Sequence, residues 1–193
     1  MIIKTNVEGV TLDFAAKSPR SCRDCQLCCK LLPNVHFEKP SNTRCQHQRV
    51  GKGCTIYANR PLECRMWSCL WLAGPEETQG MPRPDRCHYV IDPLSDEIRL
   101  HNETGHTQAM ECIQVWVDPA FPEAKNDRTL RGFMLRAAQE RGMPTLLRWS
   151  NSLATVVFPP GIIGDEWAEK TAPCNPGIGR FNRLPKSIQD RLD

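Results

Sequence analysis

The chain has 193 residues, of which 40% are hydrophobic and 24% are charged, with a net charge of +3 and a pI near 8.3. These values are ordinary for a globular protein, and the length allows one core or a small core plus a metal-stapled lobe. No apolar run reaches the ~18 residues of a membrane-spanning helix, so we expect no membrane partner. The mild positive charge argues against nucleic acid as a partner.

The first part of the chain is predicted to form short helices between loops. Residues 1–20 alternate loosely between apolar and polar side chains, which predicts one strand or an extended lead-in. Helices are predicted over residues 22–32, which a serine precedes and a proline follows, and over residues 60–72, which open with Arg-Pro. The Pro- and Gly-rich segment 74–86 is typical of a linker. The two expected lobes, packed as a single unit, are residues 1–74 and 75–193.

The second half is predicted to contain a small antiparallel sheet. Alternating apolar side chains and turn residues predict two hairpins, with turns over residues 93–96 and 150–152, and one further strand. The predicted strands cover residues 87–92, 97–101, 111–117, 145–149 and 153–158.

One long helix completes the predicted fold. Apolar side chains spaced by three and four residues predict it over residues 127–141, with Asn126 or Asp127 as its cap. Trp167 and Phe181 are the expected anchors of the Pro- and Gly-rich tail. The predicted fold class is α+β, in which a cysteine-rich, metal-stapled helical lobe precedes a small antiparallel sheet with one long helix.

Cysteine departs most from ordinary composition. The chain has eleven cysteines, and eight of them lie between residues 22 and 69. The first residues lack a basic stretch followed by an apolar stretch and a cleavage site, which predicts a cytoplasmic location where thiols stay reduced. Many thiols crowded together in a reducing compartment favour a metal over a disulfide framework.

Two groups of cysteines are the predicted metal ligands. The first group is spaced Cys-x-x-Cys-x-x-Cys-Cys, and each Cys-x-x-Cys unit aims two sulfurs at one point. On a helix the adjacent Cys28 and Cys29 point about 100° apart. We therefore expect either that one binds the metal while the other lies in its second shell, or that the two bind different metal ions. The second group has long spacings and implies a folded loop. The predicted ligands are Cys22, Cys25, Cys28, Cys29, Cys45, Cys54, Cys64 and Cys69.

The donor type narrows the choice of metal. Thiolates suit zinc, Cu(I) and iron–sulfur clusters, and they disfavour magnesium and calcium. Eight thiols could form two sites of four sulfurs each, one polynuclear cluster, or one site with the remaining thiols unused. The spacing of the cysteines does not distinguish these arrangements. The expected cofactor is therefore zinc or an iron–sulfur cluster, with a metal ion as the one predicted partner.

A longer pattern surrounds the cysteines. After the first group and Cys45, residues 53–65 read Gly-Cys-Thr-Ile-Tyr-Ala-Asn-Arg-Pro-Leu-Glu-Cys-Arg. Over residues 22–69 the chain resembles the YkgJ-like cysteine-cluster family, which is described as a zinc- or iron-chelating domain. The resemblance implies metal chelation by the matched cysteines but no settled reaction, and Cys69 falls in a variable part of the pattern. The flagellin lysine methylases look similar in this cluster, which keeps an iron–sulfur centre open.

Several residues near the cluster have simpler interpretations. Arg60 or Arg65 is expected to donate hydrogen bonds to thiolates or backbone carbonyls and to offset negative charge. His47 lies close to Cys45 in sequence, but with eight thiols available a surface or hydrogen-bonded histidine is the preferred interpretation. The cysteines outside the segment are interpreted as two packing residues and one loose thiol or late ligand, namely Cys87, Cys112 and Cys174.

Three functions remain open at this point. The first is a cytoplasmic metal-binding protein that holds zinc or an iron–sulfur centre through cysteine thiolates. The second is an iron–sulfur- or iron-dependent enzyme that uses the cluster for redox chemistry or substrate positioning. The third, which the mild charge disfavours, is a zinc module that docks on nucleic acid or protein. The sequence contains no His-Glu-x-x-His, Gly-x-Ser-x-Gly or phosphate-loop motif, so catalytic residues, a substrate and a protein partner stay unknown.

Overall fold

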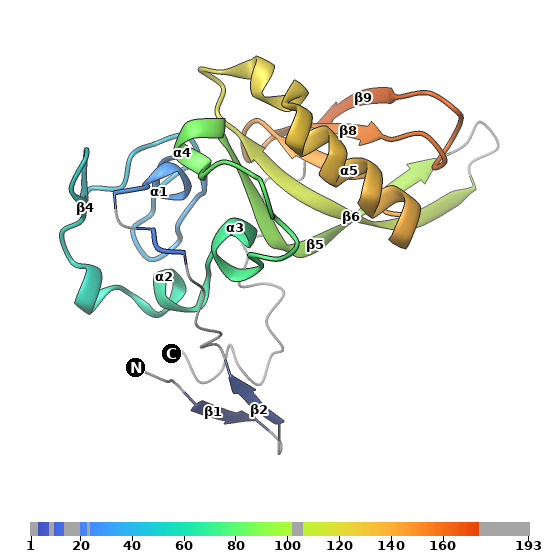
Figure 1. Cartoon of the computed structure of the whole chain (residues 1–193). Coiled ribbons are helices and arrows are strands. Elements are labelled where there is room, and N and C mark those ends of the chain that lie inside the picture. The colour runs from blue at the N-terminus through green and yellow to red at the C-terminus, as the bar shows by residue number, and fades with distance from the viewer. Residues whose placement is uncertain (1–3, 8–9, 14–19, 23, 102–105, 174–193) are drawn as a thin grey trace.

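The computed structural model describes residues 4–7, 10–13, 20–22, 24–101 and 106–173 (Figure 1). Of the three tail residues singled out above, Cys174 and Phe181 lie outside these ranges, and Trp167 is 38% exposed. Near the start of the chain, β1 (Lys4–Val7) pairs with β2 (Val10–Asp13) as an antiparallel hairpin, where the sequence predicted a single strand or a lead-in.

The region that holds the predicted metal ligands, residues 20–74, is here called the cysteine lobe. Its elements are short, and its longest helices have five residues. In chain order they are α1 (Leu27–Leu31), β3 (Gln48–Arg49), β4 (Gly53–Cys54), the 3-10 helix η1 (Tyr57–Asn59), α2 (Leu62–Met66) and α3 (Leu70–Ala73). The sequence correctly places helices here but makes them too long.

Backbone geometry explains both shortened helices. Gln26, with φ −135° and ψ 14°, is non-helical, so α1 begins only at Leu27. The predicted second helix is split because Trp67 is extended, with φ −103° and ψ 138°. The Trp67 indole donates a 3.0 Å hydrogen bond to Asp92 of the sheet. The predicted helix therefore breaks at the residue that makes this contact with the sheet, although the helix propensity of the segment favours one continuous helix.

The predicted linker is folded against the rest of the molecule. It contains turns and α4 (Pro84–Cys87), and its Thr78 is fully buried. Arg20 donates hydrogen bonds to the carbonyl of Trp71 at 2.7 Å and to the hydroxyl of Thr78 at 2.6 Å. The proposed boundary after residue 74 stays a prediction.

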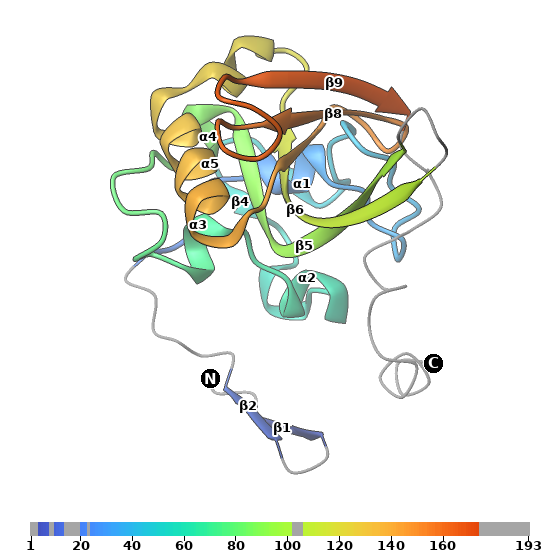
Figure 2. The same cartoon turned by 90° about the vertical axis from the view of Figure 1, so that its right-hand side faces the viewer.

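The second region, residues 84–173, is here called the sheet lobe. It holds five strands in the order β5-β6-β7-β8-β9, and Figure 2 shows their strong twist, with β8 and β9 above β5 and β6. The strands are β5 (Tyr89–His101), β6 (Thr107–Val117), β7 (Thr145–Arg148), β8 (Leu153–Phe158) and β9 (Ala168–Pro173). The mixed α+β class is confirmed.

Three details of the predicted sheet are wrong. Residues 87–101 do not form a hairpin: β5 is one long strand, with a register shift between Asp92 and Asp96, and it pairs with β6. Such a bulge lets the turn-like residues 93–96 stay within a strand. The sheet is also not wholly antiparallel, because β6 and β7 are parallel and the chain crosses between them through a helix. The last strand, β9, was not predicted.

That crossover helix, α5 (Arg128–Arg141), matches its prediction closely. The Asp127 carboxylate accepts hydrogen bonds from the backbone amides of Thr129 and Leu130 at the first turn. Gly142, at φ 64°, ends the helix in the left-handed region that glycine adopts at low cost. None of the helices in the described ranges is both long and apolar enough to cross a membrane.

Alternate residues of the sheet face two different partners. One face packs against α5, where Leu130 and Met134 are fully buried with Val115 and Leu147. The other face meets the cysteine lobe, where Leu31 of α1 packs in a cluster that contains Val90 and Trp116. The cysteine lobe is therefore held against the sheet by an apolar contact next to its cysteines.

Candidate metal centre

The eight predicted ligands come from every part of the cysteine lobe. Cys22 and Cys25 lie in a turn, closed by a 2.6 Å hydrogen bond from the Cys25 amide to the Cys22 carbonyl. The Cys45 amide donates to the carbonyl of Cys29, which brings the following loop back to α1. The remaining positions are α1 for Cys28 and Cys29, β4 for Cys54, α2 for Cys64 and the start of α3 for Cys69. All eight are free thiols.

Seven of these thiols interact electrostatically with one another. Burial is the main cause of the raised pKa of Cys64 and Cys69, and charge on neighbouring cysteines raises both values further. The same interactions connect all of the predicted ligands except one: Cys22, Cys25, Cys28, Cys29, Cys45, Cys64 and Cys69. Cys54 lies on the β3–β4 hairpin. The fold thus gathers thiols separated by up to 47 positions in sequence.

Cys28 and Cys29 form a hydrogen-bonded pair. The Cys28 thiol donates to the sulfur of Cys29, which raises the pKa of Cys28 and lowers the pKa of Cys29. Lys39 and Arg60 lie near enough to lower the pKa of Cys29 further. Cys29 is therefore the more readily ionised of the two.

Three of the other thiols, Cys25, Cys64 and Cys69, retain their protons near neutral pH. Burial raises the pKa of Cys25 and of Cys64 to about 11, and the pKa of Cys69 to about 12. A metal that binds these sulfurs must displace their protons, because only the thiolate is a ligand.

A buried cation lies at the end of the helix that carries Cys28 and Cys29. Lys39 is 8% exposed, and its ammonium donates to the carbonyls of Lys30, Leu32, Pro40 and Thr43. These carbonyls belong to the last turn of α1 and to the loop that leads to Cys45. Lys39 therefore ties the two ligand-bearing segments together and supplies positive charge beside the thiols.

Arg60 is the second cation beside the thiols. Its guanidinium lies 3.8 Å from the centre of the Tyr57 ring and donates to the Tyr57 carbonyl at 3.1 Å. Its charge lowers the thiol pKa at Cys22, Cys29 and Cys64, against the opposing effect of burial. The predicted role of Arg60 as a donor to a backbone carbonyl is confirmed, whereas Arg65 is exposed on α2.

Arg83, just before α4, approaches two of the same thiols. It donates to the carboxylates of Asp24 at 2.7 Å and Asp85 at 2.6 Å, and its charge lowers the pKa of Cys22 and Cys25 against burial. Neither Lys39 nor Arg83 was singled out from the sequence. Their local sequence gives no sign that they differ from ordinary solvent-exposed cations. Their partners are carbonyls and carboxylates that the fold brings to them.

The donor set fits a soft metal, although the sulfurs are not arranged around one point. Among the described residues, no three Cys, His, Asp or Glu side chains form a metal-binding group. Seven clustered sulfurs with cations around them suit zinc or an iron–sulfur cluster, whose charge would be offset by those cations.

Three other residues lie where packing explains them. The His47 ring packs at a tilt against Phe37, with the ring centres 5.0 Å apart. Cys87 ends α4, and Cys112 is fully buried in an apolar cluster of the sheet, which confirms both as packing residues.

The comparisons with known proteins leave the resemblance to be tested by experiment. No protein-family model, no curated protein and no solved structure matches the chain.

Proposed function

We propose that this protein is a metal-binding protein of the YkgJ-like cysteine-cluster type, in which cysteine thiolates of the cysteine lobe hold zinc or an iron–sulfur centre. The observation that carries the proposal is that seven of the eight predicted ligands lie near enough to shift the pKa of at least one other member of the set, or to have their own pKa shifted by one. A reducing compartment such as the cytoplasm keeps these thiols available.

The surrounding cations support the same function. Lys39, Arg60 and Arg83 come from three different segments and face the thiols. Such charges have little reason to converge on neutral thiols, whereas they stabilise a site that becomes negative when four or more thiolates bind a divalent metal. The proposed ligands are the seven coupled cysteines, and Cys54 is the least supported member of the predicted set.

Structural or metal-handling use of the centre is the working function. An open hollow of about 620 Å³ on the sheet lobe is lined by Asn126, Arg131, Trp167 and Glu169, and a cavity of about 50 Å³ lies between α3, α5 and β5. Neither of these two is lined by a proposed ligand, so neither of them offers a substrate a place at the thiols.

The test is anaerobic purification followed by metal analysis and an absorption spectrum. A colourless protein with zinc in whole-number stoichiometry identifies a zinc site. Iron with labile sulfide and a broad visible band identifies an iron–sulfur cluster. Less than one equivalent of any metal under these conditions contradicts the proposal.

A matched pair of variants assigns the ligands. Cys28→Ala is expected to lose at least one metal equivalent or to lower the affinity strongly. Cys112→Ala also removes a buried thiol, but that thiol lies in the sheet and its loss should leave the metal content unchanged. Equal metal loss in both variants would show that general destabilisation, rather than ligation, is responsible.

A further inference from the structure

Positive charge is concentrated in the cysteine lobe. Residues 39–75 contain six lysines and arginines and one acidic residue, Glu63, which gives this segment a net charge of +5. The whole chain carries +3, so the remaining residues sum to −2. The mild total charge therefore conceals a basic region.

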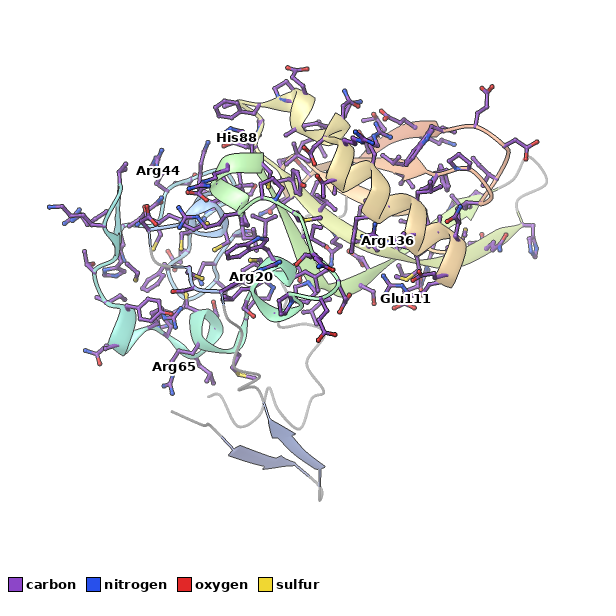
Figure 3. The ribbon with its side chains drawn as sticks, viewed as in Figure 1. Arg20, Arg44, Arg65, His88, Glu111 and Arg136 are labelled. Carbon is purple, nitrogen blue, oxygen red and sulfur yellow. The ribbon has the colours of Figure 1, made fainter. Side chains whose placement is uncertain are left out.

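The six cations divide into two sets according to what they face. Lys39 and Arg60 approach the thiols and are occupied by carbonyls and by the Tyr57 ring. The other four are exposed and make no ion pair within the described residues, and they are here called the outer cations. They are Arg44, Arg49, Lys52 and Arg65. Figure 3 shows the two that it labels, Arg44 and Arg65, on the side of the cysteine lobe that faces away from α5.

An exposed aromatic ring and an apolar tip lie between these cations in the sequence. Val50, at the turn of the β3–β4 hairpin between Arg49 and Lys52, is 75% exposed. Tyr57 is 55% exposed, and its ring already stacks with the Arg60 guanidinium. Exposed rings beside cations are the surfaces on which single-stranded nucleic acids stack their bases while the backbone follows the charges.

We propose that this outer edge of the cysteine lobe binds single-stranded nucleic acid, with phosphates on the outer cations and a base on Tyr57. Three of the four outer cations are arginines, whose planar guanidinium pairs with phosphate through two parallel hydrogen bonds. The inner cations offset the charge of the thiolates, so the outer set stays available to an anionic partner. An acidic protein surface is the competing occupant, and the experiment separates the two.

The experiment titrates the metal-loaded protein into a fluorescently labelled single-stranded RNA of about 20 nucleotides and mixed sequence, longer than the ~4–16 that one small module covers. Four phosphate contacts predict a slope of about −3 for log affinity against log salt, or about a fifty-fold loss between 50 and 200 mM. Replacing the outer cations together, R44Q/R49Q/K52Q/R65Q, should bring that slope close to zero. Tyr57→Ala should weaken binding about tenfold.

A matched quadruple variant controls for total charge. R86Q/R128Q/R136Q/R141Q removes the same four charges from exposed arginines of the sheet lobe, including Arg136 on α5 (Figure 3), and should leave binding within about twofold, because only contacting cations change the slope. Unchanged metal content shows that both variants fold. Equal losses in the two variants, or no saturable binding at 50 mM salt, would overturn the proposal. Competition by polyglutamate as effective as by unlabelled RNA would also overturn it, in favour of an acidic protein partner.

Discussion

The two lobes are stabilised in different ways. In the sheet lobe, the fourteen-residue α5 covers a five-stranded sheet, and many large apolar side chains are fully buried. In the cysteine lobe the described helices have four or five residues, and the buried apolar side chains are few: Leu27, Leu31, Leu32, Cys69 and Leu70. Helices this short are unstable on their own in water. The contrast indicates that the sheet lobe is stabilised by its core, and it predicts that the cysteine lobe depends on the proposed metal.

Metal removal should give the largest difference between the lobes. Structural zinc contributes on the order of 10–16 kcal/mol to the folding of small zinc domains, so a chelator should unfold α1 to α3. Hydrogen exchange measured before and after chelation should show lost amide protection there and retained protection in β6, β7 and β8. Retained protection in the metal-free cysteine lobe would contradict this account.

A core substitution should destabilise the sheet lobe and leave metal binding unchanged. Leu130 is fully buried between α5 and the sheet, so Leu130→Ala should lower the free energy of unfolding of this lobe by about 2–5 kcal/mol. Its metal content should stay that of the unchanged protein. Denaturant titration and metal analysis of the same samples separate the two effects.

The sequence predicts the sheet lobe better than the cysteine lobe for the same reason. The cap, the apolar stripe and the terminal glycine of α5 are all local signals, so its bounds were predicted to within one residue. The strand β5 was divided because Pro93 and Asp96 signal a turn, whereas pairing with β6 on both sides keeps them in the strand. The parallel pairing of β6 with β7 depends on the path of the crossover, which no local pattern records.

The cysteines of the candidate site could be selected from the sequence, but the residues that surround them could not. Spacing and residue type pointed to the cysteines, because thiolate chemistry is a property of the residue itself. The position of Lys39 depends on four carbonyls, and the split between α2 and α3 accompanies a bond from Trp67 to Asp92. Such contacts exist only once the chain has folded.

An ion pair between the lobes should give the next largest effect. Lys30, on α1, donates to both oxygens of Asp118 at 2.8 and 2.6 Å, just after β6, and the Asp118 side chain is only 4% exposed. Lys30→Met leaves that carboxylate without its cation, at an expected cost of about 2 kcal/mol, because the lysine itself is a quarter exposed. Denaturant titration measures the loss.

A surface pair gives the control for this change. Arg99 and Glu97 form a 3.0 Å ion pair with both side chains more than half exposed, so Arg99→Met should change stability by at most about 0.5 kcal/mol. Adding Asp118→Asn to Lys30→Met should recover part of the loss, since the buried charge is then removed. A Lys30→Met effect no larger than that of Arg99→Met would show that the ion pair does not join the lobes.

The smallest expected effect concerns two arginines five positions apart. Arg60 lowers the pKa of Cys22, Cys29 and Cys64 against their burial, whereas Arg65 is exposed and has no such role. Arg60→Gln should therefore weaken metal affinity about tenfold, and Arg65→Gln, with the same charge change, should leave it unaltered. Competition with a chelator of known affinity measures both.

The pH dependence of the Arg60→Gln effect tests its cause. Without Arg60 the three thiol pKa values rise, so protons compete more strongly with the metal at pH values below them. The affinity deficit of Arg60→Gln should therefore be largest at low pH and should shrink as pH rises toward the pKa of Cys29, the lowest of the set. A deficit that stays constant across pH would mean that Arg60 acts by holding the loop against Tyr57 rather than by its charge. Arg60 would then stabilise the conformation of its loop. The stability of the cysteine lobe would depend less on the charges around the thiols than on the bonds between the thiolates and the metal.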